Sequence, residues 1–229
     1  MLFRSGFGNA LNTQRTVRYL ERAGAAAIQL EDQSFPKRCG HLDGKKLISR
    51  GEMVGKVKAA LDARRSDDTL IIARTDARGA HGGTLDNAIE RANAYLAAGA
   101  DMAFVEGPTD VDEVKRICAE VEGPVFYNQT GISPRFSREQ MTELGIAATI
   151  LPGASMRVTM QAVYDFAVRL RDEGALVEQE FANQFKDHPV GDFHTFAGFD
   201  QIREWEEAYL APEELEKYAD SVGHLPKSA

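Results

Sequence analysis

The sequence segment 30–41, LEDQSFPKRCGH, combines a pair of carboxylates, a thiol and several cations. Lys37 and Arg38 precede Cys39, and His41 follows it closely. Neighbouring cations stabilise the thiolate form of a cysteine, which a proton-transferring cysteine requires. A structural cysteine normally lies among apolar neighbours. We therefore predict that Cys39 takes part in acid–base chemistry, in preference to the alternative of a free loop cysteine without a role.

The second cysteine has a different environment. Cys118 lies at helical spacing from Val114 and Val121, a setting typical of packing in a core. We assign it no chemistry. Two cysteines make neither a disulfide framework nor a zinc cluster.

Five short apolar runs alternate with segments of helical spacing, which is typical of β/α units. The predicted strands are Ala26–Leu30, Leu70–Ala73, Met102–Val105, Pro124–Tyr127 and Ala148–Leu151. The predicted helices are Leu11–Ala23, Glu52–Arg64, Leu85–Ala98, Val111–Val121, Arg138–Leu144 and Met156–Glu173. Right-handed crossovers make such strands parallel.

Each predicted strand is followed by a polar residue or a turn. These are Glu31, Arg74, Glu106, Asn128 and the pair Pro152-Gly153. Because β/α folds build their sites at the carboxyl ends of parallel strands, we expect the site there.

Some charged residues near these strand ends have structural alternatives. Arg74 can bind a ligand carboxylate with its guanidinium fork, or it can form a salt bridge to Asp76 or Glu106. Asp32 and Asp76 can each orient a reacting residue, cap a helix or make a structural hydrogen bond. His41 has the same alternatives, and we retain it as a candidate.

Charge and composition exclude several classes of function. The net charge of −8 opposes association with nucleic acid or anionic lipid. Lys45 and Lys46 could attract an anionic substrate, but a solvated pair is the commoner state of adjacent lysines. No segment approaches the ~20 apolar residues that span a bilayer, and the opening six residues are too short for the apolar region of a signal peptide. We therefore expect a cytoplasmic protein.

The pattern changes after Gly174 to short acidic and aromatic segments. We predict small helices within 176–185, 199–209 and 212–222, separated by turns. This divides the chain into a β/α domain, residues 1–174, and a helical extension, residues 175–229. The extension is expected to pack on a neighbouring subunit, and a cap over its own subunit is an equal alternative.

Several motifs together resemble the lyase branch of the phosphoenolpyruvate mutase and isocitrate lyase superfamily. They are Gly6-Phe7-Gly8-Asn9, Glu31-Asp32-Gln33, Lys37-Arg38-Cys39-Gly40-His41, Ala73-Arg74-Thr75-Asp76-Ala77, Phe104-Val105-Glu106 and Asn128-Gln129-Thr130. Their order matches the family, and the resemblance extends to about Gly174.

The resemblance implies a TIM-type β/α barrel and a carbon–carbon lyase that cleaves a small 2-hydroxy dicarboxylate or tricarboxylate, such as methylisocitrate or dimethylmalate. It implies that Cys39 is the general acid or base, with Arg74 and His41 also catalytic. It implies that Glu31 holds Mg2+ through water, with Mn2+ as an alternative, and that the enzyme is a homotetramer or dimer. The substrate would be bound by Cys39, Gly40, Arg74, Glu106, Asn128, Thr130 and Arg157.

The sequence also departs from this family. The positions at which the family carries two Mg2+-binding aspartates fall on Leu2 and Arg4, neither of which binds a hard cation. A complete barrel has eight units in about 250 residues, so we expect about three N-terminal units to be lacking.

Three alternative functions remain open. Two belong to the same superfamily, a carboxyphosphonate or phosphoenolpyruvate phosphorylmutase and an oxaloacetate hydrolase or decarboxylase. The third is an inactive chain that acts only as a structural or interaction subunit, as the replaced metal carboxylates would allow.

Overall fold

The computed structural model of the protein describes residues 6–40 and 42–217 of the 229-residue chain. The chain divides into two compact units, with the boundary between Met156 and Arg157. Leu2, Arg4 and His41, which the sequence analysis singled out, lie outside the described residues.

The first unit contains a parallel sheet with strand order β1-β2-β3-β4-β5. Its strands are β1 (Ala27–Glu31), β2 (Leu70–Thr75), β3 (Met102–Val105), β4 (Val125–Asn128) and β5 (Ile146–Ile150). Its helices are α1 (Ala10–Arg22), α2 (Arg50–Ala63), the 3-10 helix η1 (Ala77–Gly79), α3 (Leu85–Ala97), α4 (Val111–Glu120) and α5 (Arg138–Glu143). The predicted β/α alternation is confirmed, and these bounds differ from the predicted ones by at most two residues.

Local sequence explains where the helices begin and end. Side chains of Ser49, Thr84 and Asp110 accept hydrogen bonds from backbone N–H groups in the first turns of α2, α3 and α4. Gly99 and Gly145 follow α3 and α5 with φ of 106° and 72°, a conformation in which glycine meets no steric penalty.

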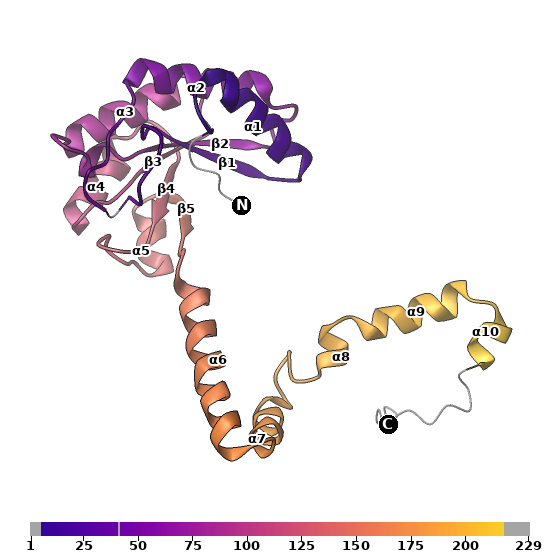
Figure 1. Ribbon diagram of the computed structural model, residues 1–229. Coiled ribbons are helices and arrows are strands. Elements are labelled where there is room, and N and C mark those ends of the chain that lie inside the picture. The colour runs from indigo at the N-terminus through magenta and orange to yellow at the C-terminus, as the bar shows by residue number, and fades with distance from the viewer. Residues whose placement is uncertain (1–5, 41, 218–229) are drawn as a thin grey trace. The chain divides into compact units, whose positions relative to one another are not determined.

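Strand side chains alternate between two environments. On the outer face, Ile28, Leu30, Ile71 and Ala73 pack against Val17, Leu20, Met53 and Val57 of α1 and α2. A second outer cluster joins Ala103, Val105 and Val125 to residues of α3 and α4. Figure 1 shows α1 to α4 along this outer side of the sheet. The apolar core therefore lies between sheet and helices, and the opposite face of the strands carries the polar residues Glu31 and Arg74 together with Phe104.

The second unit is helical. It contains most of α6 (Ala154–Glu173), together with α7 (Leu176–Phe185), α8 (Phe193–Phe196), α9 (Phe199–Tyr209) and α10 (Pro212–Glu216). The predicted tail helices over 176–185 and 199–209 have these same bounds, and residues 218–222 of the third lie outside the described residues.

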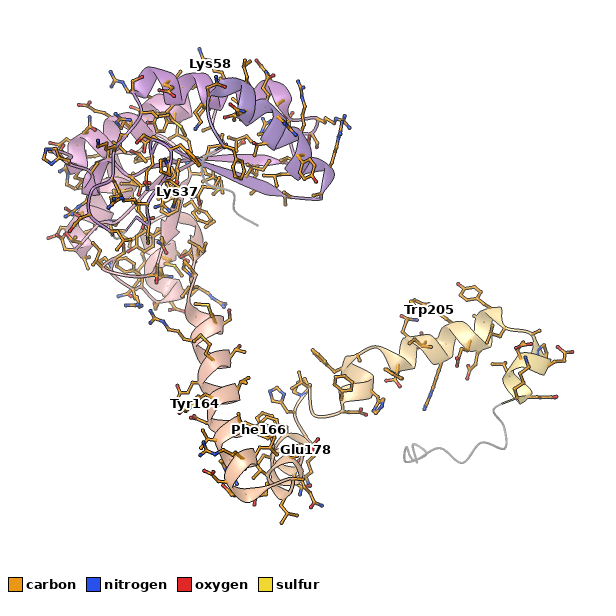
Figure 2. The ribbon with its side chains drawn as sticks, viewed as in Figure 1. Lys37, Lys58, Tyr164, Phe166, Glu178 and Trp205 are labelled. Atoms are coloured by element: carbon orange, nitrogen blue, oxygen red, sulfur yellow. The ribbon has the colours of Figure 1, made fainter. Side chains whose placement is uncertain are left out.

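The division into units differs from the predicted boundary at Gly174 because α6 associates with α7. The Phe166 and Phe181 rings of these helices lie 5.5 Å apart, and Arg169 pairs with Glu180 at 2.8 Å. Figure 2 labels Phe166 on α6 and Glu178 on α7. None of the helices in the described part of the chain is long and apolar enough to cross a bilayer.

Candidate active site

Four predicted site residues from neighbouring strands converge at the carboxyl ends of the sheet. Glu31 ends β1, Arg74 lies near the end of β2, Glu106 follows β3 and Asn128 ends β4. The register pairs Glu31 directly with Arg74. Their exposed fractions are 0%, 3%, 2% and 6%. The structure thus brings these residues together in a nearly dry environment, in which electrostatic interactions are strong.

Arg74 is the central cation of this cluster. Its Nε and Nη2 donate to the Asp76 carboxylate at 3.0 and 2.9 Å, and its Nη1 lies 3.1 Å from Glu106 Oε2. The guanidinium also lies over the Phe104 ring, 5.0 Å from the centroid. Burial opposes its charge, but Asp76, Glu106 and Glu31 outweigh burial and raise the pKa of Arg74. A guanidinium has five N–H donors, so these internal pairs leave donors for a ligand.

Glu31 is a buried carboxylate in an unusual environment. Neither of its oxygens accepts a hydrogen bond from a described residue. The nearest cations are Lys37 Nζ, 3.4 Å from Oε1, and Arg74 Nε, 3.6 Å from Oε2. Burial outweighs the attraction of these cations and raises the pKa of Glu31 to about 7. In Figure 2, Lys37 lies within the body of the first unit, whereas Lys58 extends from α2 toward solvent.

A buried carboxylate without hydrogen bonds is a suitable partner for hydrated Mg2+, a hard cation that keeps several waters. Glu31 therefore fits the predicted contact to Mg2+ through water. In residues 6–40 and 42–217, however, no group of three or more His, Cys, Asp or Glu side chains is arranged to hold a metal ion. The described residues supply one contact rather than a complete metal site.

The loop that carries Cys39 lies directly over Arg74. Gly40 is buried, and a Cβ at this position would lie 2.8 Å from Glu106 Cγ and would overlap Arg74 Nη2. Only glycine therefore allows the backbone to approach this closely. Cys39 itself is exposed, so its thiol is accessible at the edge of the cluster.

Lys45 holds this loop in place. It is only 5% exposed, and its Nζ donates to the Gly40 carbonyl. The expectation of a solvated lysine pair is wrong for Lys45, although Lys46 is exposed. The physical reason is that a backbone carbonyl turned into the protein requires a donor, and Lys45 provides it.

The cations next to Cys39 in the sequence have other partners in the structure. Lys37 pairs with Glu31 at 3.4 Å. The Arg38 guanidinium donates to the Asp43 carbonyl at 3.2 Å. Adjacency in the sequence therefore does not make either cation a partner of the thiol, because loop conformation directs side chains separately. The role of Cys39 itself stays a prediction.

Asp32 and Asp76 have the structural roles that the sequence left open. Asp76 forms the bidentate pair with Arg74. Asp32 points away from Arg74 and accepts hydrogen bonds from the Asp76 N–H at 2.9 Å and from the Tyr95 hydroxyl at 2.8 Å. Burial raises the pKa of Asp32, and the hydrogen bonds from Asp76 and Tyr95 oppose that shift.

The remaining predicted residues are distributed more widely. Asn128 Nδ2 donates to Glu106 Oε1 at 3.3 Å, while Asn128 Oδ1 has no partner among the described residues. Thr130 is half-buried in the loop after β4. Arg157 is exposed on α6 in the second unit, so its role stays a prediction. Cys118 is half-buried on α4, and burial raises its pKa, in agreement with a packing role.

Three residues of this region were missed from the sequence. Lys45 looked like a surface lysine, and Tyr95 and Arg91 looked like ordinary residues of an amphipathic helix. Tyr95 and Arg91 are four residues apart, hence on one helix face, and both bind Asp32. Their spacing was visible, but nothing in the sequence linked that face to Asp32.

Comparison with known proteins gives consistent matches. Residues 3–171 match the family model described as phosphoenolpyruvate phosphomutase. The chain is 41% identical over 211 residues to 2,3-dimethylmalate lyase of Eubacterium barkeri, which covers 90% of this chain and 70% of that protein. It is 49% identical over 160 residues to 2-methylisocitrate lyase of Aeropyrum pernix, and this match covers 69% of this chain and 51% of that protein.

A solved structure of phosphonopyruvate hydrolase in complex with oxalate and Mg2+ is similar with a TM-score of 0.76 at 29% identity. The match covers 92% of this chain and 72% of that one. The chain thus spans between about half and 70% of the length of these curated relatives.

Proposed function

This chain belongs to the phosphoenolpyruvate phosphomutase family, and we propose that it serves as a Mg2+-dependent carbon–carbon lyase. The substrate would be a small 2-hydroxy dicarboxylate or tricarboxylate similar to dimethylmalate or methylisocitrate. The products would be a 2-oxo acid and a second carboxylic acid. The names of the two curated relatives support this choice of substrate class.

One observation carries the proposal. The Cys39-Gly40 turn lies against the buried Arg74 and Glu106 pair, with no room for a side chain at Gly40. The residue before Gly40 is Cys39, whose thiol can give or take a proton, and the guanidinium under Gly40 can bind a carboxylate or an enolate oxygen. This combination suits cleavage of a bond next to a carboxylate.

In the proposed reaction, the hydroxyl gives up its proton to solvent water, and the carbon that bears it becomes a carbonyl as the carbon–carbon bond breaks. The electron pair of that bond remains on the other fragment as an enolate, which takes up a proton. Arg74 stabilises the developing oxygen charge, and the Cys39 thiol supplies the proton. Asn128, whose Oδ1 has no partner among the described residues, and Thr130 orient the substrate.

Mg2+, held in part through water by Glu31, would supply further stabilisation of charge on the substrate oxygens. Mn2+ prefers similar oxygen ligands. Arg157 stays a predicted ligand of a substrate carboxylate, and His41 would assist Cys39. A cytoplasmic, homo-oligomeric enzyme completes the proposal.

A turnover assay tests this proposal. The purified chain with Mg2+ is incubated with 2,3-dimethylmalate, 2-methylisocitrate or phosphonopyruvate, and 2-oxo acid release is followed by coupled reduction. We expect release from a hydroxy acid and none from the phosphonate. Loss of phosphonopyruvate alone, followed by 31P NMR because a mutase would release no 2-oxo acid, would instead favour the mutase branch. No turnover of any compound would favour the structural subunit.

A further inference from the structure

Asp32 forms two hydrogen bonds with the backbone at the end of β2. Its backbone N–H donates to the Arg74 carbonyl at 3.1 Å, and its Oδ1 accepts from the Asp76 N–H at 2.9 Å. The segment from Arg74 to Asp76 therefore has both of its ends bound to Asp32, the residue that follows the neighbouring strand β1. This segment carries the guanidinium of the candidate site and the carboxylate that holds it.

The other oxygen of Asp32 is bound by helix α3. Tyr95 donates its hydroxyl to Oδ2 at 2.8 Å, and Arg91 Nη1 lies 3.1 Å from the same atom. Arg91 also donates to the Ile48 carbonyl at 3.2 Å. Asp32 and Tyr95 are both 0% exposed, so no water competes for these bonds. The carboxylate can hardly rotate while all of its partners are in place.

We propose that Asp32, locked by Tyr95 and Arg91, is a positioning residue that orients the Arg74 guanidinium through Asp76. The order of contacts is Tyr95 to Asp32, Asp32 to the Asp76 N–H, and the Asp76 carboxylate to Arg74. The hydrogen bonds of the Tyr95 and Arg91 side chains are to Asp32, Ile48, Asn87 and each other, and none is to a residue of the proposed substrate site. The consequence for catalysis rests on the proposed function, but the orientation of Arg74 does not.

The direction of a bidentate guanidinium–carboxylate pair is set by whichever partner is better fixed. The Arg74 side chain is long and flexible, whereas Asp76 is short and follows the backbone turn that Asp32 holds. Loss of the Tyr95 hydroxyl removes one of the bonds that keep Asp32 in place, and misalignment by a fraction of an ångström is costly in a preorganised site.

The test uses the Arg74 Nε–H, which donates to Asp76 at 3.0 Å. Its exchange with water is measured by 15N NMR on the full chain, with the resonance assigned by its loss in Arg74→Lys. We expect Tyr95→Phe to accelerate exchange by about tenfold, since a bond to a charged group is lost. Asp32→Asn should have a larger effect, and Tyr95→Phe keeps the test valid if Asp32→Asn does not fold.

Tyr127→Phe is the matched control. Tyr127 is also buried, and its hydroxyl donates to the Pro134 carbonyl at 2.6 Å, a hydrogen bond outside the series of contacts from Tyr95 through Asp32 to Asp76. Exchange that stays unchanged in Tyr95→Phe, with a stability loss equal to that of Tyr127→Phe, would overturn the proposal. If the wild-type chain turns over a hydroxy acid, kcat should fall by about tenfold in Tyr95→Phe with KM nearly constant. If the wild type shows no turnover, the proposed function fails while the exchange measurement still decides the positioning role.

Discussion

At the scale of single residues, Glu31 and Asp32 show how a strand separates two adjacent carboxylates. Successive strand side chains point to opposite faces of a sheet. Glu31 therefore faces Arg74, at 3.6 Å, while Asp32 faces helix α3 and Tyr95. The first is positioned to act in the site, and the second holds the site together.

Glu31 predicts a pH dependence of stability in the metal-free protein. Its pKa is raised from 4.5 to about 7 by burial, so between these values the folded state holds a proton that the unfolded state has released. Folding stability should therefore fall as the pH rises from 4.5 to 7 and level off above, with a total effect of at most ~3 kcal/mol. Glu31→Gln should remove this slope in urea denaturation. The exposed Glu90→Gln is the control, and an unchanged slope in Glu31→Gln would refute the assignment.

The two cysteines offer a matched pair. Cys39 is exposed beside the Gly40 turn, whereas Cys118 is half-buried on α4. Cys39→Ser should lower kcat at least ~100-fold without weakening the binding of oxalate, because a hydroxyl is a far weaker acid than a thiol. Cys118→Ser should leave kcat unchanged and cost only stability. Steady-state kinetics and calorimetric titration measure both effects, and normal kcat in Cys39→Ser would exclude its role.

At the scale of elements, the loop between β1 and α2, called the strap below, is held by hydrogen bonds at several places. Its two ends meet where Gln33 forms a bridge with Leu47 and where the Ser34 N–H donates to the Lys46 carbonyl at 2.8 Å. The Cys39-Gly40 tip is fastened separately by Lys45. The strap therefore keeps its overall path even if the tip is released.

Lys45→Met should release the tip alone. Loss of a charged hydrogen bond of ~1.5–3 kcal/mol predicts amide exchange in residues 37–40 and 42–44 that is faster by at least ~tenfold. Hydrogen exchange followed by mass spectrometry measures this. Lys46→Met, which changes an exposed neighbour, is the control. Equal exchange in both variants would mean that Lys45 does not hold the tip.

At the scale of the whole molecule, the chain consists of a sheet unit with a dense core and a helical unit without one. Within the described part of the second unit, Val177 is the only buried apolar residue. Met160, Val163 and Leu170 recur on one face of α6 and are 64%, 60% and 41% exposed. Contiguous exposed apolar side chains of this kind mark interaction surfaces.

We therefore expect the chain to form homo-oligomers through α6. Sedimentation equilibrium should give a mass above that of one chain. The double substitution Met160→Glu with Val163→Glu should shift the mass toward the monomer, because buried unpaired charges are unfavourable. Gln161→Glu, an exposed polar residue on the same helix, should leave the mass unchanged. A monomeric wild type would contradict the prediction.

Local sequence determined the elements, because apolar periodicity, capping residues and glycines after helices act over a few residues. The strand ends Glu31, Arg74, Glu106 and Asn128 could be predicted as one cluster for the same reason, since parallel strands place their carboxyl ends at one edge. The family motifs could likewise be read directly from residue order.

Contacts between distant segments could not be read in this way. Whether Arg74 forms internal salt bridges or keeps donors for a ligand depended on Asp76 and Glu106 lying within 3.1 Å of its nitrogens. Lys45 was buried by the inward turn of the Gly40 carbonyl, and Tyr95 met Asp32 across 63 residues of sequence. Hydrogen bonds of this kind require direction and distance in three dimensions, which residue type and spacing along the chain do not contain, so tertiary structure alone decided them.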